Sequence, residues 1–484
     1  MGKLLMAISS ISFGEWTPDQ PGITNGLRRA ENVYPKLVGY GAIPTVVDYS
    51  AAASENLNNV VAGKTTAGAT IVFAGGSTKL FKLDSADLSL DNVSKSGNYT
   101  TPTDQRWKFT QFGNVIVAAN GFDKLQGFNL NSSSLFADLA ADAPTARYVT
   151  VVRDFVVSGY QSSYPNRVQW SALGDEASWT ASATTQADFQ DIPDGGSVVG
   201  VTGGEFGLVF MDRAIHRMSY VGSPLIFQFD NISRNLGCYE ANSIIQYGGT
   251  SFFLGDDGFY ACDGQNIVPI GSEKVNRFFF DNVDEGTLYL MSAAVDPSKK
   301  LIIWAYASNS SSTPDSLLIY NFQTQKWTSG TTNVDKIAST STPAVTLEGM
   351  DTYGTLETIL TSFDSRLWLG GKLQLAGVDG AKIVTFSGAN ATAYIETGDI
   401  EVPGSTSAIT MVKPIVDDGS GSVALLSRRL LSESTTFGSQ TAADSENRVA
   451  VRGVGRYHRL QLTPTGSWTS AVGMDIDLSP LGTR

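Results

Sequence analysis

Few residues in this chain are of the types that catalysis and metal binding most often use. It has two histidines, His216 and His458, and two cysteines, Cys238 and Cys262. A serine hydrolase needs a histidine beside its nucleophile, and the nucleophile elbow G-x-S-x-G does not occur in the sequence. The histidines and cysteines also lack the spacing of a zinc site. We therefore predict that the protein is not an enzyme and that it holds neither a metal nor a cofactor.

The two cysteines leave two alternatives open. A single disulfide can form only if Cys238 and Cys262 lie on neighbouring strands with the right geometry. Two buried thiols are the favoured alternative, because free cysteine packs as a small apolar residue. The low cysteine content is also typical of proteins that assemble in a reducing cytoplasm.

Turns rich in aspartate, such as Asp256-Asp257-Gly258 and Asp417-Asp418-Gly419, could in principle bind calcium. The twelve-residue pattern of a calcium loop is missing from both. Aspartate followed by glycine is instead typical of tight hairpin turns, and we interpret these segments as such.

An excess of arginine near the C-terminal end is the one local charge feature that stands out. Between residues 428 and 459 there are three acidic residues and six arginines: Arg428, Arg429, Arg448, Arg452, Arg456 and Arg459. One interpretation is a solvated strand face. The other is a subunit or adaptor interface, in which arginine meets an acidic patch of a neighbouring protein through bidentate hydrogen bonds.

In contrast to this arginine-rich region, the chain as a whole is acidic, with a formal net charge of −13. Proteins that coat nucleic acid need clustered Lys and Arg, so this balance argues against such a role, although DNA could still pass close to the protein. No apolar stretch approaches the 18 residues of a membrane span. Charged residues make up only 17% of the chain and glycine is abundant, with 49 residues, which favours many short strands and tight turns.

The elements that must position these residues follow a repeated sequence pattern, which we call a cassette. It consists of an apolar β-type run, a turn and a second β-type run. Its six copies are marked by Phe73, Ile116, Val156, Val209, Phe253 and Ile302. The mean step of about 46 residues lies in the range of β-propeller blades. We predict an all-β protein with a propeller of six blades.

Changes in the content of turn residues and in the periodicity of apolar residues divide the chain into three parts. Residues 1–65 contain many turn residues and little periodicity, so we predict an N-terminal arm that packs on the main body or on a neighbour. The cassettes place the propeller at 66–395, with a poorer match from residue 341 onward. Residues 396–484 alternate apolar and polar side chains in several runs, which predicts a small C-terminal β-domain that carries the interface arginines.

Three stretches together resemble one known family. They are 19–26 with 31–35, then 393–399, then 455–460, whose sequences are DQPGITNG with ENVYP, AYIETGD and GRYHRL. With the cassettes between them, they are similar to the tail hub or nozzle proteins of short-tailed bacteriophages, also called packaged-DNA stabilisation proteins. The resemblance spans nearly the whole chain.

The resemblance implies a structural virion protein: a six-bladed propeller with an added β-domain, present as a homo-hexamer. Six copies would form the distal tube of the tail below the portal and adaptor proteins, after assembly in the host cytoplasm. The tube would retain packaged genomic DNA and conduct it during ejection, without sequence-specific binding. Tail fibres or spikes and a tail needle or plug would dock on it. The lumen would lie between subunits, because the channel of a single propeller is narrow.

Two rival functions remain. A receptor- or carbohydrate-binding propeller, such as a tail adhesin, should show aromatic and polar pockets repeated in each blade. A glycoside hydrolase on a propeller is less favoured, because the repeated Asp boxes of sialidase-like propellers are absent from the sequence.

Overall fold

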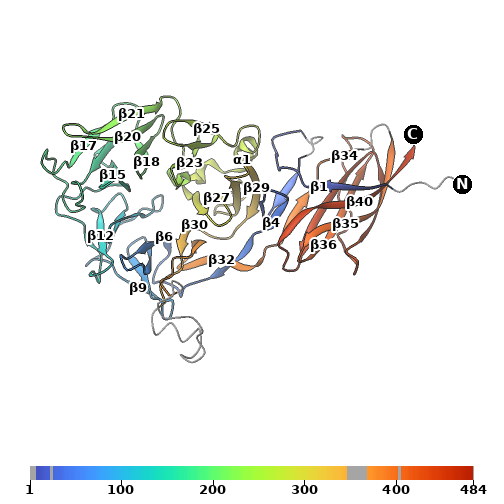
Figure 1. Ribbon diagram of the computed structural model, residues 1–484, viewed down its shortest axis with the longest axis horizontal. Helices are drawn as coiled ribbons and strands as arrows, with labels where there is room; N and C mark the ends of the chain where they lie inside the picture. The colour runs from blue at the N-terminus through green and yellow to red at the C-terminus, as the bar shows by residue number, and fades with distance from the viewer. Residues whose placement is uncertain (1–6, 22–25, 346–367, 402–404, 483–484) are drawn as a thin grey trace.

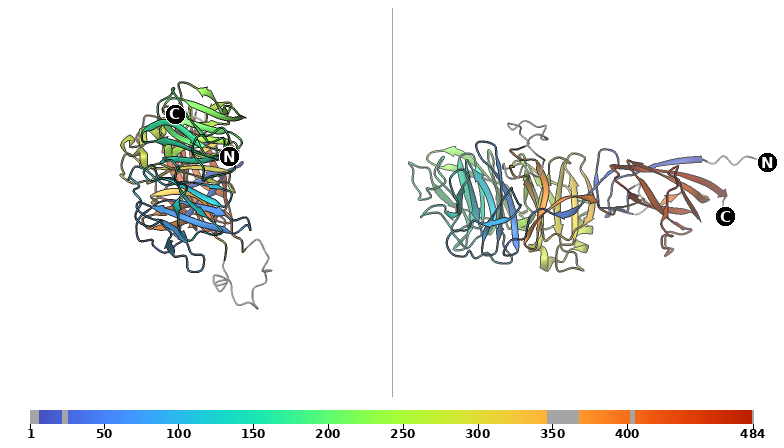
Figure 2. Two further views of the ribbon diagram at one scale, coloured as in Figure 1. Left: turned by 90° about the vertical axis from the view of Figure 1, so that its left-hand side faces the viewer. Right: turned by 90° about the horizontal axis from the view of Figure 1, so that it is seen from below.

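The computed structural model describes residues 7–21, 26–345, 368–401 and 405–482. They form an elongated molecule built almost wholly of β-strands, with a ring of antiparallel sheets at one end and a two-sheet sandwich at the other (Figures 1 and 2). The first and last strands, β1 (Ala7–Ser12) and β40 (Ser470–Gly482), pair with each other in the sandwich. Both ends of the described chain therefore lie away from the ring.

Five sheets of the ring each contain four consecutive strands in chain order, and we call each such sheet a blade. Blade one has β6 (Leu57–Lys64), β7 (Thr70–Gly76), β8 (Leu80–Leu83) and β9 (Leu90–Asn92). Blade two has β10 (Lys108–Phe112), β11 (Val115–Ala119), β12 (Gln126–Asn129) and β13 (Ala137–Asp138). Blade three has β14 (Tyr148–Val152), β15 (Phe155–Gln161), β16 (Tyr164–Trp170) and β17 (Asp188–Asp191). Blade four has β18 (Val198–Thr202), β19 (Gly207–Met211), β20 (Ile215–Gly222) and β21 (Ile226–Ser233). Blade five has β22 (Ile245–Tyr247), β23 (Thr250–Gly255), β24 (Gly258–Cys262) and β25 (Ile267–Pro269).

The last two blades differ in how they are completed. Blade six has β26 (Ser292–Asp296), β27 (Leu301–Tyr306), β28 (Ser316–Asn321) and β29 (Lys326–Thr331), and its sheet continues beyond β29. Blade seven has β30 (Lys336–Ser341), β31 (Leu373–Asp379), β32 (Lys382–Asn390) and, as its fourth strand, β5 (Pro44–Asp48). Val384 of β32 lies opposite Asp48 of β5, so the two distant parts of the chain close this blade together.

The ring closes through the first strand of each blade. β6 contacts both β10 and β30, β14 contacts β10 and β18, and β26 contacts β22 and β30. Blades four and five are joined by a hydrogen bond of 3.0 Å between the hydroxyls of Thr202 and Ser251. Radially arranged four-stranded sheets that close in this way are a β-propeller, which confirms the predicted fold class.

The second strand of each blade is the most apolar because neighbouring blades cover both of its faces. All five residues of β19 and all six of β27 are buried, and the other second strands of blades one to six are nearly so. Buried on both faces, such strands become continuous apolar runs rather than alternating ones. The six cassette markers all lie in these second strands.

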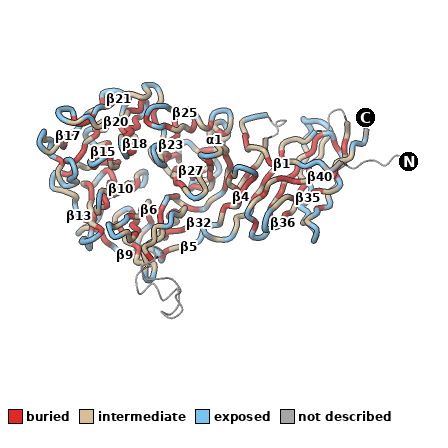
Figure 3. Tube along the Cα trace, viewed as in Figure 1, coloured by how far each residue is buried: buried red, intermediate tan, exposed pale blue. Residues whose placement is uncertain are grey.

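Two sheets form the sandwich at the other end, where buried strand segments alternate with exposed turns (Figure 3). The first sheet contains β1, β3 (Val33–Pro35), β4 (Tyr40–Ala42), β35 (Thr406–Asp417), β38 (Val449–Gly455) and β40. The second contains β33 (Tyr394–Glu396), β34 (Ile400–Glu401), β36 (Ser420–Arg428), β37 (Thr441–Ala442) and β39 (Tyr457–Thr465). Val412 and Leu460, one from each sheet, belong to the same buried cluster.

Blade six and the sandwich share one continuous sheet. The short strand β2 (Arg29–Glu31) pairs in parallel with β29 and antiparallel with β33, which yields ten strands in one sheet. A single buried apolar cluster extends from Trp304 of blade six to Trp468 of the sandwich. The one α-helix among the described residues, α1 (Asn276–Asn282), lies before blade six, and Trp16 packs edge-on against its Phe278. Two short 3₁₀ helices, Ala241–Ser243 and Glu285–Leu290, precede blades five and six.

The described residues contain seven blades, so the predicted number of six was wrong. The uncounted blade has no fully apolar second strand: β31 has the sequence LQLAGVD, and its Leu373 is exposed. Residues 346–367, between β30 and β31, lie outside the described residues.

The segment predicted as an arm, residues 1–65, is divided among three places. β1, β3 and β4 belong to the sandwich, β5 to blade seven and β6 to blade one. At the other boundary, β33 crosses from residue 394 to residue 396 and pairs with β39 of the sandwich. The β-domain predicted from the runs in residues 396–484 is present, with β35, β36, β38, β39 and β40 as its longer strands.

Candidate functional site

Two of the predicted interface arginines hold one buried carboxylate. Asp399 lies between β33 and β34, and its side chain is 2% exposed. Arg428 of β36 donates to both of its carboxylate oxygens at 2.8 Å, and Arg459 of β39 donates from Nε and Nη2 at 3.0 Å. Burial acts to raise the pKa of Asp399, but the hydrogen bonds from Arg459 and Arg428 outweigh it, and the pKa is lowered. Asp399 is therefore ionised and fixes two strands of one sheet.

Other predicted arginines also pair within the chain. Arg456 forms an ion pair with Glu401 at 2.7 Å, and Arg459 reaches Glu396 at 3.4 Å. Arg448 pairs with Asp444 and Glu446 in the turn before β38. The structure thus brings Arg428, Arg456 and Arg459 together against acidic residues of 396–401, and these three serve the fold.

Arg429 and Arg452 differ from the other four. Both are exposed, and in the described part of the chain neither guanidinium group lies within 4 Å of a carboxylate. Arg429 donates only its backbone N–H to Glu433, at 2.8 Å. Of the six predicted interface residues, these two side chains remain available for a contact with another protein.

The three stretches that carry the family resemblance converge where blade six meets the sandwich. Glu31 lies opposite Tyr394 in the strand pairing, and Thr397 donates its backbone N–H to the carbonyl oxygen of Leu460 at 3.0 Å. Asn32 donates to the carbonyl oxygen of Thr392 at 2.9 Å. The carboxylate of Asp19 accepts hydrogen bonds from two backbone N–H groups at the start of α1. Residues 22–25 of the first stretch lie outside the described residues. Residues of all three stretches thus make contacts at one junction.

His458, inside the third stretch, links the two sheets of the sandwich. It is 0% exposed, with its Nε2 at 2.9 Å from Ser407 Oγ of β35 and its Nδ1 at 2.8 Å from Ser427 Oγ of β36. Burial lowers the pKa of His458, so the ring is neutral near pH 7. Because Ser407 is also fully buried, a substrate cannot reach this serine–histidine pair.

The two cysteines are free and buried, which resolves the open alternative in favour of thiols. Cys238 donates to the carbonyl oxygen of Glu240 at 3.2 Å, and burial raises its pKa to about 12. His216 is buried in β20, and its Nε2 has no hydrogen-bond partner among the described residues. In the same residues, no three His, Cys, Asp or Glu side chains gather as metal ligands would.

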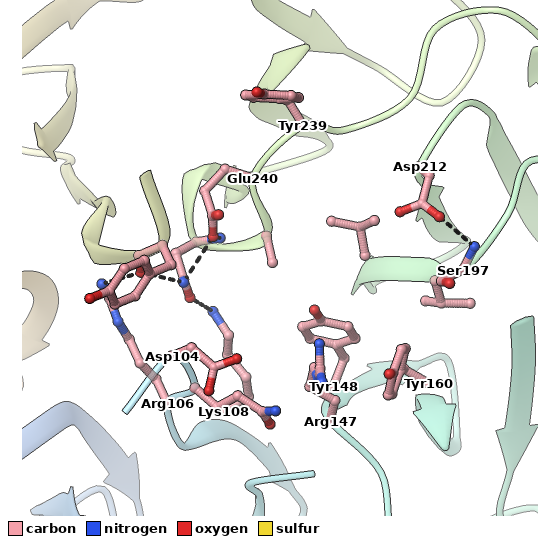
Figure 4. Close-up of a pocket in the computed structure, with 16 residues that line it drawn as sticks. Asp104, Arg106, Lys108, Arg147, Tyr148, Tyr160, Ser197, Asp212, Tyr239 and Glu240 are labelled. Carbon is pink, nitrogen blue, oxygen red and sulfur yellow. Dashed lines mark hydrogen bonds between the residues drawn. The ribbon is translucent and has the colours of Figure 1, made fainter. Parts of the chain in front are cut away.

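A cavity of about 360 Å³ opens at the centre of the ring (Figure 4). It is lined by segments that lead into the first strands of blades two to six, including Arg106, Lys108, Tyr148, Glu240 and Tyr289. In Figure 4, Arg106 and Lys108 lie on one wall below Glu240, while Tyr148 and Tyr160 lie on the facing side. The sequence analysis missed this site, because its residues come from five blades and share no motif.

A second cavity, of about 430 Å³, lies between the outer parts of blades five and six. The rings of Tyr247 and Phe322 pack 5.0 Å apart in its wall, and Asp263 and Asn266 contribute polar groups. The wall of this cavity thus combines aromatic faces with hydrogen-bonding groups.

No protein-family model and no curated protein matches the chain. Among solved structures, the WD40 domain of Pan2 from Neurospora crassa is similar at 7% identity and a TM-score of 0.38, over 71% of this chain and 95% of that one. The WD40 domain of coronin from Toxoplasma gondii is similar at 8% identity and a TM-score of 0.37, over 74% and 88%. The computationally designed Ika8 protein is similar at 10% identity and a TM-score of 0.38, over 72% and 100%.

These similarities are too low to carry an argument about function, and the propeller assignment depends on the sheet order of the chain itself. Within the residues described, no helix has the length and apolar character needed to cross a membrane.

Proposed function

We propose that this protein is a structural subunit of the tail nozzle of a short-tailed bacteriophage. The observation that carries the proposal is the convergence of the three family-like stretches at the junction of propeller and sandwich, with Glu31 opposite Tyr394 and the backbone of Thr397 hydrogen-bonded to that of Leu460. If the chain shares the architecture of that family, the stretches that resemble it should meet at one place in the fold although they are far apart in the sequence. The proposed role is therefore mechanical.

The rigidity of the joint supports this role. A ten-stranded sheet and one apolar cluster run through it, and the buried Asp399 ion pairs lie at its edge. A subunit of this kind can hold its two parts at a fixed angle while it is loaded by packaged DNA. Closely packed interiors transmit strain rather than absorb it, which suits a tube wall under pressure.

The proposed assembly is a hexamer in the virion tail, built in the host cytoplasm beneath the portal and adaptor proteins. The central cavity of one propeller, about 360 Å³, is far too small for duplex DNA, so the DNA would pass between subunits. A net charge of −13 favours a wall that DNA slides along without binding. Arg429 and Arg452 are the proposed subunit or adaptor contacts, and fibres or spikes and a needle or plug would dock elsewhere on the tube.

Imaging by negative-stain electron microscopy tests the proposal directly. The purified protein would be imaged alone and with the portal–adaptor complex of the same virus. We expect sixfold rings with a centre open enough for duplex DNA. Arg429→Glu with Arg452→Glu should abolish the rings, whereas Lys64→Glu with Lys372→Glu, an equal charge change on two exposed residues of the ring, should preserve them. A protein that stays monomeric under both conditions would exclude the nozzle.

The cavity between blades five and six favours one second candidate, a carbohydrate-binding propeller. Tyr247 and Phe322 offer aromatic faces on which a sugar ring could stack, and Asp263 and Asn266 offer partners for its hydroxyls. A glycan array distinguishes the candidates: a specific hit that Phe322→Ala removes would favour the adhesin, and an array without hits would dismiss it.

A further inference from the structure

Two cations line the central cavity of the ring without a carboxylate partner. Arg106 is 8% exposed and donates from Nη2 only to two neutral groups, the carbonyl oxygens of Tyr289 at 3.2 Å and Leu290 at 2.6 Å. Lys108 donates from Nζ to the amide oxygen of Asn242 at 3.0 Å. Neither side chain forms an ion pair with any described residue within 4 Å. Burying a charge without a counter-charge is costly, so this arrangement needs an explanation.

The nearest acid in the cavity does not neutralise both cations. The Oε1 atom of Glu240 accepts from the backbone N–H of Asn242 at 2.9 Å and from its side-chain amide at 3.0 Å. Burial and the charge of Arg106 lower the pKa of Lys108 to about 8, which leaves it mostly protonated at neutral pH. Burial and the charge of Arg106 also lower the pKa of a third cation, Lys336 at the start of β30, to about 8, and the charge of Asp335 opposes them. Buried Arg106 and half-buried Lys108 thus share the cavity wall with one half-buried carboxylate, that of Glu240.

The other two carboxylates that line the cavity are open to solvent. Asp104 and Asp212 line it and are exposed, and Asp212 accepts a hydrogen bond from the backbone N–H of Ser197 at 2.7 Å. Arg147 lies over the ring of Tyr160, 4.1 Å from its centroid, and so rests against the wall. These exposed carboxylates would repel an extended polyanion more strongly than a compact anion, which carries fewer charges. The volume of about 360 Å³ also lies at the small end of ligand sites.

We propose that the inner end of this cavity binds a compact oxyanion, a carboxylate or a phosphate on a small molecule, through Arg106 and Lys108. The guanidinium of Arg106 still has nitrogens without hydrogen bonds to described residues, and a planar guanidinium can hold two oxygens of one anion. Lys108 would add a point charge beside it. The bound anion would supply the counter-charge that the protein itself lacks at this place.

Isothermal titration calorimetry at neutral pH would test the site with two probes, inorganic phosphate and glucuronate. Lys108→Gln keeps a donor for Asn242 but removes the charge, and should weaken binding by about tenfold or more. Glu240→Gln keeps the acceptor for Asn242 but removes the negative charge, and should strengthen binding by about threefold. Lys413→Gln, an exposed change in the sandwich, should leave binding unchanged. Opposite effects of the first two variants cannot arise from simple damage to the fold.

Binding of either probe with these opposite effects would support the site and identify which oxyanion it prefers. Failure of both probes to bind at millimolar concentration would overturn the proposal. So would binding that Lys108→Gln leaves unchanged, or that Lys108→Gln and Glu240→Gln both weaken. A DNA oligonucleotide serves as the third titrant, and its binding with a loss in Lys108→Gln would replace the small anion by nucleic acid and so reject the proposal as stated. None of these outcomes depends on whether the protein forms a nozzle.

Discussion

Asp399 and Arg459, 60 residues apart in the sequence, form a two-bonded ion pair in which the carboxylate side chain is 2% exposed. Arg428 binds the same carboxylate from the adjacent strand. Asp399 and the two arginines thus form a largely buried network of ion pairs beside the joint between propeller and sandwich.

Replacement of Asp399 by alanine should therefore destabilise the protein strongly. It leaves two largely buried guanidinium groups without a counter-charge, and loss of one partner of a buried pair costs about 3 kcal/mol or more. Chemical denaturation with urea measures the change. The matched control is Glu446→Gln, which removes an exposed partner of Arg448 and should cost less than about 1 kcal/mol. Equal effects of both variants would show that the Asp399 pairs do not stabilise the joint.

His458 should make the sandwich sensitive to acid. Burial lowers its folded-state pKa below the ordinary value of 6.5, so below about pH 6.5 the unfolded chain binds a proton that the folded protein does not. Stability is then present above the unfolded pKa and is lost as the pH falls, by up to about 1.4 kcal/mol per pH unit.

Urea unfolding near pH 7 and near pH 5 tests this for His458→Gln, whose amide can still reach the two serine hydroxyls. The variant should lose less stability on acidification than the unchanged protein. Burial lowers the pKa of His216 as well, so His216→Gln measures how much the second buried histidine contributes to the acid sensitivity. An acid response of His458→Gln equal to that of the unchanged protein would mean that the buried ring does not titrate as expected.

The strand β5 should tolerate proline at one position and not at the next. Tyr49 donates its N–H to Ile383, and the alternation of an antiparallel ladder then turns the N–H of Val47 toward β32 and that of Val46 away from it. Val47→Pro should remove a ladder hydrogen bond and destabilise blade seven by about 1 to 3 kcal/mol. Val46→Pro should cost less. Limited proteolysis of residues 44–56 and thermal unfolding would report both, and the reverse order would contradict the register.

The thiols of Cys238 and Cys262 should not react with a thiol reagent in the native protein. Both are buried, and burial raises the pKa of each thiol, so neither forms the reactive thiolate at neutral pH. Titration with a chromogenic disulfide should find no reactive thiol before denaturation and two after it. Cys262→Ala would assign any signal that does appear. Rapid labelling of a native thiol, or fewer than two thiols after denaturation without reductant, would contradict the structure.

Much of the ring was predictable because its blades follow a physical regularity. A second strand covered on both faces must be apolar throughout, and the six markers from Phe73 to Ile302 mark such strands. Blade seven escaped notice because β31 contains Gln374 and an exposed Leu373, and because its fourth strand comes from residues 44–48. A strand borrowed from elsewhere in the chain leaves no local repeat.

The arginine-rich region was harder to interpret because charge pairing is a property of the folded sheet. A count restricted to 428–459 misses Glu396, Asp399 and Glu401, which precede it and neutralise three of its arginines. The central cavity could not be predicted either, since Arg106 and Glu240 come to line one cavity only when the ring has closed. Both the arginine ion pairs and the central cavity depend on which strands become neighbours in the fold, and the composition of the chain does not reveal that.

The closure of blade seven by β5 also has a consequence for biosynthesis. A ribosome releases β5 early, yet its partner β32 begins only at Lys382, and β1 pairs with β40, the last strand of all. The N-terminal strands β5 and β1 must therefore wait, with unpaired backbone groups, until β32 and β40 have emerged. A free strand edge is a template for wrong pairing, so we expect newly made chains to be most prone to aggregation before residue 470 has been added.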